Sequence, residues 1–133
     1  MALHIVIDTS AYSHFRRGHT QIQHHLASCD TALVPTIVLG ELEAGFQRGS
    51  RYEENSVVLQ EFLSEPFVRT LDVTPQVSRI YGRYFTLLRS AGTPIPTNDI
   101  WIAACATSVG AVVVTFDPHF TKIPQLDVEL LTP

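Results

Sequence analysis

The sequence predicts a three-layer α/β/α fold around a central, mainly parallel sheet of about four to five strands. Two observations lead to this class. Short, uninterrupted apolar runs rich in β-branched residues occur at 5–7, 32–34 and 111–115, as in strands that are buried on both faces. Longer segments with apolar residues at helical spacing separate these runs. Such alternation is typical of parallel, doubly wound sheets.

The expected strands are apolar segments bounded by turn residues. They cover residues 5–7, 32–34, 67–73, 111–115 and 126–131, the last at an edge of the sheet. The expected helices cover residue 9 to Gly18, then 20–29, 35–48, 51–64, 75–91 and 98–108. Pro35 and Pro75 open two of these helices, because proline has no N–H to leave unpaired at the first helical position. Thr74 and Thr97 are the expected N-caps.

Length and composition indicate one globular domain over residues 1–133. The chain is 45% apolar and 17% charged. Two distant cysteines, Cys29 and Cys105, indicate buried thiols of a reducing compartment rather than a disulfide. No signal peptide and no apolar run of membrane-spanning length is found, so we expect a soluble cytoplasmic protein with no membrane contact.

The charged residues give a mixed indication. The net charge of −4 argues weakly against a broad nucleic-acid surface. Eight of the nine basic residues are arginines, which suit phosphate recognition, although compositional drift explains them equally well. The six histidines show no zinc-ligand spacing, and we expect most of them at the surface.

Four carboxylates are predicted to meet at one edge of the sheet. Asp8 and Asp117 follow strands, and Glu41 and Asp99 lie near the starts of helices that follow the sheet. Asp8 and Asp117 also suit helix N-caps, and Asp99 complements a helix dipole. Glu41 is harder to explain structurally, because its helical neighbours are small and apolar and turn it toward the body of the protein.

Together, the four acids predict a metal site. Carboxylates at such short range raise one another's pKa values, and no lysine is placed among them. Oxygen ligands suit Mg²⁺ or Mn²⁺. A cation of this kind can orient a phosphate and activate a water, which is the chemistry of phosphodiester hydrolysis.

A specific combination of four segments then points to a family. These segments are residues 7–10, 41–42, 95–104 and 114–120. In their order and spacing the chain resembles PIN-domain ribonucleases, in particular the VapC toxins of type II toxin–antitoxin pairs. The resemblance covers about residues 3–131.

The resemblance implies a metal-dependent endoribonuclease, a small VapB-like antitoxin as partner and a homodimer. Its catalytic and metal-binding positions match Asp8, Glu41 and Asp99, with Asp117 as a more variable fourth. Its supporting hydroxyl positions match Thr9 or Ser10, and Thr115. An acid often stands where this chain has His119, so the resemblance leaves a second metal site uncertain. Arg16 and Arg17 are our choice for contacts with the RNA backbone, although both also suit a solvated helix end.

Three alternatives fit the sequence less well, and the last of them lacks a required acid. A PIN domain without catalytic activity would act only as a binding partner. A response-regulator receiver has the same architecture, and Asp72, Thr115 and Lys122 superficially fit its pattern, but it leaves Glu41 and Asp99 unexplained. A haloacid-dehalogenase-like phosphatase requires an acid at position 10, which is serine.

Overall fold

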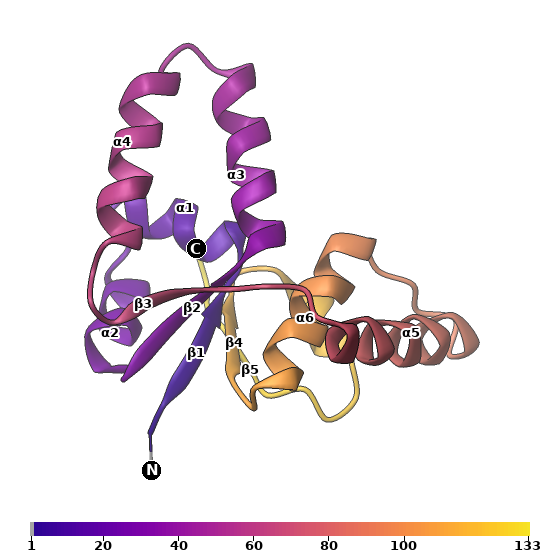
Figure 1. Ribbon diagram of the computed structural model, residues 1–133. Helices are drawn as coiled ribbons and strands as arrows, with labels where there is room; N and C mark the ends of the chain where they lie inside the picture. Colours follow the sequence, from indigo (N-terminus) through magenta and orange to yellow (C-terminus); the bar gives the residue numbers. More distant parts are fainter. Residues whose placement is uncertain (1) are drawn as a thin grey trace.

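The computed structural model describes residues 2–133. Five parallel strands form one sheet, in the order β3-β2-β1-β4-β5 (Figure 1). The strands are β1 (His4–Ile7), β2 (Thr31–Pro35), β3 (Val68–Leu71), β4 (Val112–Thr115) and β5 (Val128–Leu130). The helices are α1 (Thr9–Arg16), α2 (Thr20–Ser28), α3 (Thr36–Arg48), α4 (Tyr52–Leu63), α5 (Pro75–Ser90), α6 (Thr97–Ser108) and the 3₁₀ helix η1 (Pro118–Lys122). The predicted fold class is therefore confirmed.

The direction in which the chain crosses the sheet reverses next to β1. From β1 the chain moves outward to β2 and β3, and then returns to β4 on the other side of β1. Ile5 pairs with Ala32 of β2 on one side and with Val112 of β4 on the other. In open parallel sheets such a switch point opens a crevice at the carboxyl ends of the strands, where ligands bind.

Aromatic contacts fix the helices on the two faces of the sheet. On one face, the ring of Phe62 in α4 lies 5.4 Å from Tyr12 and 5.5 Å from Phe15 of α1. On the other face, Tyr81 of α5 stacks on Trp101 of α6, with ring centroids 3.8 Å apart. Helices α1 to α4 carry the chain across the sheet in one direction, and α5 and α6 carry it back in the other. Right-handed crossovers therefore place the two sets of helices on opposite faces.

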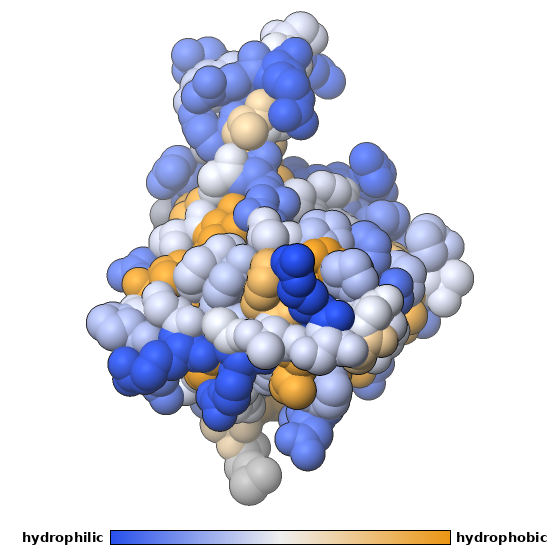
Figure 2. Space-filling view, turned by 90° about the vertical axis from the view of Figure 1, so that its right-hand side faces the viewer, coloured by the Kyte–Doolittle hydropathy of each residue, from blue (hydrophilic) through white to orange (hydrophobic). Residues whose placement is uncertain are grey.

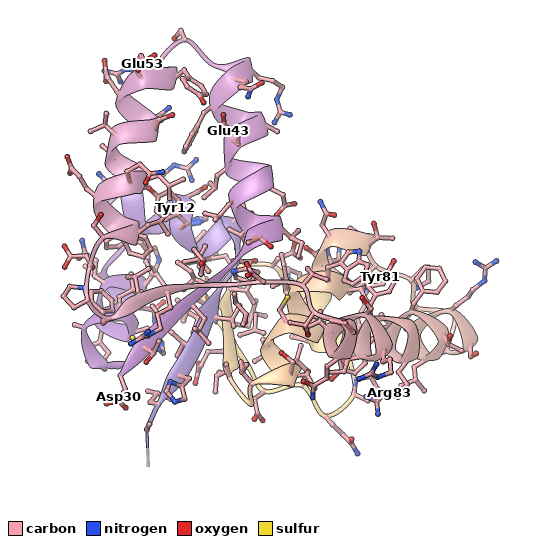
Figure 3. All side chains as sticks on the ribbon, in the orientation of Figure 1. Tyr12, Asp30, Glu43, Glu53, Tyr81 and Arg83 are labelled. Atoms are coloured by element: carbon pink, nitrogen blue, oxygen red, sulfur yellow. The ribbon has the colours of Figure 1, made fainter. Side chains whose placement is uncertain are left out.

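Helices α3 and α4 extend away from the sheet as a pair (Figure 1). Their far end is mainly hydrophilic, as the top of Figure 2 shows. Glu43 and Glu53 lie in this projecting part, away from the strand ends (Figure 3). Glu43 accepts hydrogen bonds from the Tyr52 hydroxyl and from Gln47 Nε2, and these bonds lower the pKa of Glu43. Glu43 therefore has a local role that is separate from the carboxylates at the sheet edge.

The core lies between the sheet and its helices, and its centre is the first strand. Ile5, Val6 and Ile7 are at most 1% exposed. Cys105 is buried and Cys29 half-buried, and neither forms a disulfide. Burial raises the pKa of the Cys105 thiol to about 11, so this thiol stays protonated at neutral pH. Among the described residues, no helix is both long and apolar enough to cross a membrane.

Most predicted elements are confirmed, with corrections at their ends. Pro35 is not the first helical residue as predicted: it is the last residue of β2 and the N-cap of α3, which begins at Thr36. Thr74 caps α5 as expected, since its hydroxyl accepts a hydrogen bond from Val77 N at 3.2 Å. The prediction for Thr97 is wrong: α6 begins at this residue, and Pro96 precedes it without a side-chain cap. Strand β3 ends at Leu71 rather than at residue 73, because the chain leaves the sheet there to enter α5.

Candidate active site

Asp8 lies at the carboxyl end of β1, directly beside the switch point. Its side chain is only 4% exposed. Oδ1 accepts hydrogen bonds from Ala11 N and from the Ser10 hydroxyl, each at 2.8 Å, so Asp8 is the N-cap of α1. Oδ2 accepts a hydrogen bond from the Thr115 hydroxyl at 2.5 Å. Burial raises the pKa of Asp8, and these donors oppose the rise by stabilising the carboxylate.

Two hydroxyl groups join the ends of β1 and β4 across the switch point. The Thr115 hydroxyl, which is fully buried, donates to Asp8 and accepts from Asp117 N at 2.9 Å. The Ser10 hydroxyl donates to Asp8 and accepts from Phe116 N at 3.1 Å. These bonds fix the position of Asp117 relative to Asp8.

Asp99, Asp117 and His119 form a compact group beside this junction. Asp99 lies in the first turn of α6, whereas Asp117 caps η1 by accepting a hydrogen bond from His119 N at 2.9 Å. One ligand atom from each of the three side chains lies within 4.8 Å of the others. Burial raises the pKa of Asp99 to about 6; the hydrogen bond from His119 opposes this rise and the negative charge of Asp117 adds to it. The hydrogen bond from His119 therefore compensates only part of the cost of burying the negative charge of Asp99.

Glu41 lies at the edge of the cluster rather than inside this group. Its Oε1 accepts a hydrogen bond from the Thr9 hydroxyl at 2.6 Å, and its Oε2 accepts one from Asn98 Nδ2 at 3.3 Å. Thr9 follows Asp8 and Asn98 precedes Asp99, so these two bonds connect Glu41 to the segments of both acids. A groove of about 460 Å³ opens beside Glu41 between α3 and α6. It is lined by Ile37, Gly40, Glu41, Ala44, Arg48 and Asn98.

The donor set fits a divalent cation. In residues 2–133, no lysine or arginine forms an ion pair with any of the four acids. Asp8 Oδ2 accepts only one hydrogen bond, so one of its lone pairs stays available. Clustered carboxylates with raised pKa values gain most from a positive charge placed among them, and their oxygens are the ligands that Mg²⁺ and Mn²⁺ prefer.

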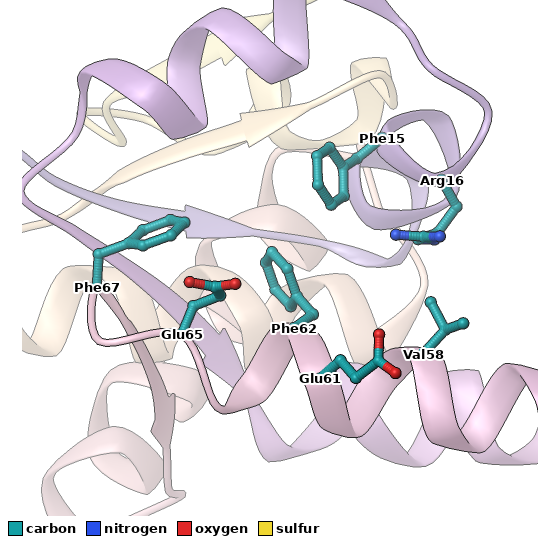
Figure 4. A pocket seen from close by; sticks show the side chains of 7 residues that line it. All are labelled: Phe15, Arg16, Val58, Glu61, Phe62, Glu65 and Phe67. Carbon is teal, nitrogen blue, oxygen red and sulfur yellow. The ribbon is translucent and has the colours of Figure 1, made fainter.

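Arg16 and Arg17 lie apart from the carboxylates. Both are exposed, and both line a groove of about 280 Å³ next to Leu42 and Phe46 of α3. Arg16 also borders a second groove, of about 330 Å³, between α1 and α4. Figure 4 shows the rings of Phe15 and Phe62 in this second groove, with Glu61 and Glu65 nearby. The predicted contact of these arginines with RNA stays a prediction.

Sequence reasoning missed the positions of His119 and Asn98. We expect most of the histidines at the surface, whereas Nδ1 of His119 lies 3.0 Å from two of the four acids. The local sequence predicts only that Asp117 can accept the backbone N–H of His119 in a tight turn, because the direction of the His119 ring toward Asp99 depends on how η1 packs beside α6. Asn98 belongs to the segment 95–104, but nothing in the sequence predicts its contact with Glu41, because this contact depends on how α6 packs beside α3.

Comparison with known proteins agrees with this geometry. The family model described as PIN domain matches residues 5–126. Ribonuclease VapC2 of Rickettsia felis is 33% identical over 105 residues, covering 78% of this chain and 77% of the relative. Ribonuclease VapC1 of Haemophilus influenzae strain R2866 is 35% identical over 98 residues, covering 73% and 72%. The crystal structure of VapBC2 from Rickettsia felis bound to a promoter DNA fragment superposes with a TM-score of 0.84 at 28% identity, covering 97% of this chain and 99% of the other.

Proposed function

The chain belongs to the PIN-domain family, and we propose that it is a metal-dependent endoribonuclease, the toxin of a VapBC-type toxin–antitoxin pair. One observation carries the catalytic part of this proposal. Asp8, Asp99 and Asp117 gather at the switch point of a parallel sheet, and no lysine or arginine of residues 2–133 pairs with them. The ribonuclease names of relatives more than 30% identical over about three quarters of the chain support the same activity.

In this proposal Asp8, Glu41, Asp99 and Asp117 hold one or two Mg²⁺ or Mn²⁺ ions. A bound cation of this kind orients the scissile phosphate, lowers the pKa of a water and stabilises charge on the leaving oxygen. The chain's own hydroxyl groups keep the acids in place: Thr115 and Ser10 orient Asp8, and Thr9 orients Glu41. Arg16 and Arg17 would attract the RNA backbone.

Cleavage of a structured RNA pool tests this proposal. The full chain is incubated with RNA in EDTA, in Mg²⁺ and in Mn²⁺, beside the variants Asp8→Asn and Asp99→Asn. We expect cleavage only with a cation, and at least about a 100-fold lower rate in each variant, because even changes behind metal ligands commonly cost 10–100-fold. Glu43→Gln is the matched control, since Glu43 lies on the same helix as Glu41 but outside the cluster. If the wild-type chain cuts nothing, a PIN domain that acts only as a binding partner is the correct assignment.

The proposed partners follow from the structural neighbours. Several are VapBC complexes, in which a toxin is assembled with its antitoxin. We propose that this chain likewise binds a small VapB-like antitoxin, and that it forms a homodimer, as its family resemblance implies. Co-expression with a small neighbouring reading frame, followed by size-exclusion chromatography with light scattering, measures both assemblies. If the chain elutes as a monomer without the co-expressed protein, both the antitoxin partner and the homodimer are contradicted.

A further inference from the structure

The ring of His119 occupies a position among the carboxylates that a metal ligand would take. Its Nδ1 atom lies 3.0 Å from Asp99 Oδ2 and 3.0 Å from Asp117 Oδ1. The side chain of His119 is 39% exposed, so the ring borders solvent while Nδ1 points inward to the two acids. The backbone N–H of the same residue donates to Asp117 Oδ1, which fixes the ring beside that carboxylate.

A proton alone satisfies this arrangement poorly. Nδ1 forms a hydrogen bond with Asp99 Oδ2, whereas Asp117 Oδ1 lies equally close to Nδ1 but accepts its hydrogen bond from the backbone N–H of His119. A cation bonded to all three atoms satisfies both carboxylates and the nitrogen together. Adjacent ligands of an octahedral ion with bonds of about 2.1 Å lie about 3.0 Å apart, so the two distances from Nδ1 suit ligation of an ion as well as they suit hydrogen bonding.

We infer that His119 is a metal ligand together with Asp99 and Asp117, and that its nitrogen makes the site prefer Mn²⁺ to Mg²⁺. This inference rests on the proposed function, because it concerns the cation of the same site. Mg²⁺ is a small, hard cation that selects oxygen ligands and keeps its waters. Mn²⁺ also suits carboxylate oxygens, but as a first-row transition metal it bonds an imidazole nitrogen more readily than Mg²⁺ does. A nitrogen among carboxylate oxygens therefore favours Mn²⁺ over Mg²⁺.

Electron paramagnetic resonance tests this inference without any measurement of activity. The full chain is stripped with EDTA and loaded with Mn²⁺, and nitrogen coupling to the bound ion is recorded by electron spin echo envelope modulation. We expect a directly coordinated ¹⁴N signal that changes to the ¹⁵N pattern when only the histidines are ¹⁵N-labelled. This labelling experiment uses the wild-type chain, so it does not depend on the folding of a variant. Bound Mn²⁺ without nitrogen coupling would overturn the inference.

Two substitutions measure the preference for Mn²⁺. His119→Asp places an oxygen ligand at this position, and we expect the ratio of the Mg²⁺ and Mn²⁺ dissociation constants to fall at least about tenfold. His24→Asn is the matched control, because His24 is an exposed histidine of α2, and it should keep both the ratio and the nitrogen signal. An unchanged ratio in a folded His119→Asp protein also overturns the inference.

The outcomes separate this inference from the proposed function. If Mn²⁺ binds without nitrogen coupling and RNA is still cut in a manner that requires Asp8, only the role of His119 is wrong. If no divalent cation binds to the wild-type chain, the metal site fails as a whole, and the inference fails with it.

Discussion

The two halves of the carboxylate cluster are stabilised by different chemistry. The strand half consists of Asp8, Ser10 and Thr115, and its carboxylate accepts three hydrogen bonds from neutral donors. The helix half consists of Asp99, Asp117 and His119; the His119 ring nitrogen pairs with Asp99, and Asp117 accepts the backbone N–H of His119 and lies 3.0 Å from the same ring nitrogen. The strand half is therefore satisfied by the protein itself, whereas the helix half gains more from an added cation.

This comparison predicts that the two halves respond in opposite ways when a carboxylate is removed. Asp8→Ala removes the cap of α1 and leaves the buried Thr115 hydroxyl without its acceptor. We expect it to lower the free energy of unfolding by about 3 kcal/mol, because a lost cap costs about 1 kcal/mol and each orphaned buried donor about 1–3. Urea unfolding in EDTA measures the change.

Asp8→Asn is the control for this loss, because it keeps the size of the side chain and one carbonyl oxygen. It should retain more of the stability than Asp8→Ala. An Asp8→Ala protein as stable as the wild type would show that the hydrogen bonds of the strand half do not stabilise the fold.

The helix half predicts a dependence of stability on pH. Burial raises the pKa of Asp99 from its ordinary value of 3.8 to about 6 in the folded chain. A raised acid pKa means that the folded state holds the proton more tightly, so stability is greatest below the lower value and is lost as the pH rises through the window between the two. The difference corresponds to about 3 kcal/mol, which partial exposure reduces to about 2.

Urea unfolding of the metal-free chain at pH 4, 5, 6 and 7 measures this dependence. Asp99→Asn has no ionisable group at this position, so it should be more stable than the wild type at pH 7 and should lack this part of the decline. Other acids titrate in the same range, and therefore the difference between the two proteins is the decisive quantity. Parallel curves for both would contradict the assignment to Asp99.

The strand half could be predicted from sequence because its parts are local. An apolar run that ends in an acid places Asp8 at a strand end, and the run before Thr115 does the same for β4. Parallel strands then bring both ends to one edge, whatever the details of packing. The caps at Asp8, Thr74 and Asp117 follow from the same local chemistry.

The helix half required tertiary information. The contact between Asp99 and His119 joins the first turn of α6 to η1, and it depends on how both pack beside the sheet. The failure at Thr97 has a related cause: a threonine suits a cap by propensity, but the extended backbone of Pro96 already provides the entry into α6. At His119 and Thr97, packing therefore decides what residue type alone does not predict.

The smallest expected effect separates two threonines that donate to site carboxylates. Thr115→Val removes a fully buried hydroxyl that donates to Asp8 and accepts from Asp117 N, so both partners lose a bond. We expect it to lower the free energy of unfolding by about 1–2 kcal/mol. Thr9→Val removes one bond to the partly exposed Glu41, which water can replace, and the loss should stay below about 0.5 kcal/mol.

Both valine variants should nevertheless lower the rate of RNA cleavage by about tenfold or more, because each removes a group that orients a proposed metal ligand. Thermal unfolding in EDTA separates the effect on the fold from the effect on cleavage. Thr74→Ala is the control for an effect on the fold alone. It removes the cap of α5, so it should lower the free energy of unfolding by about 1 kcal/mol and leave the rate of RNA cleavage unchanged. If Thr9→Val lowers the free energy of unfolding as much as Thr115→Val does, the hydrogen bond to Glu41 stabilises the fold as strongly as the bonds of the strand half. The expected difference between Asp8, at a strand end, and Glu41, on a helix, would then be wrong.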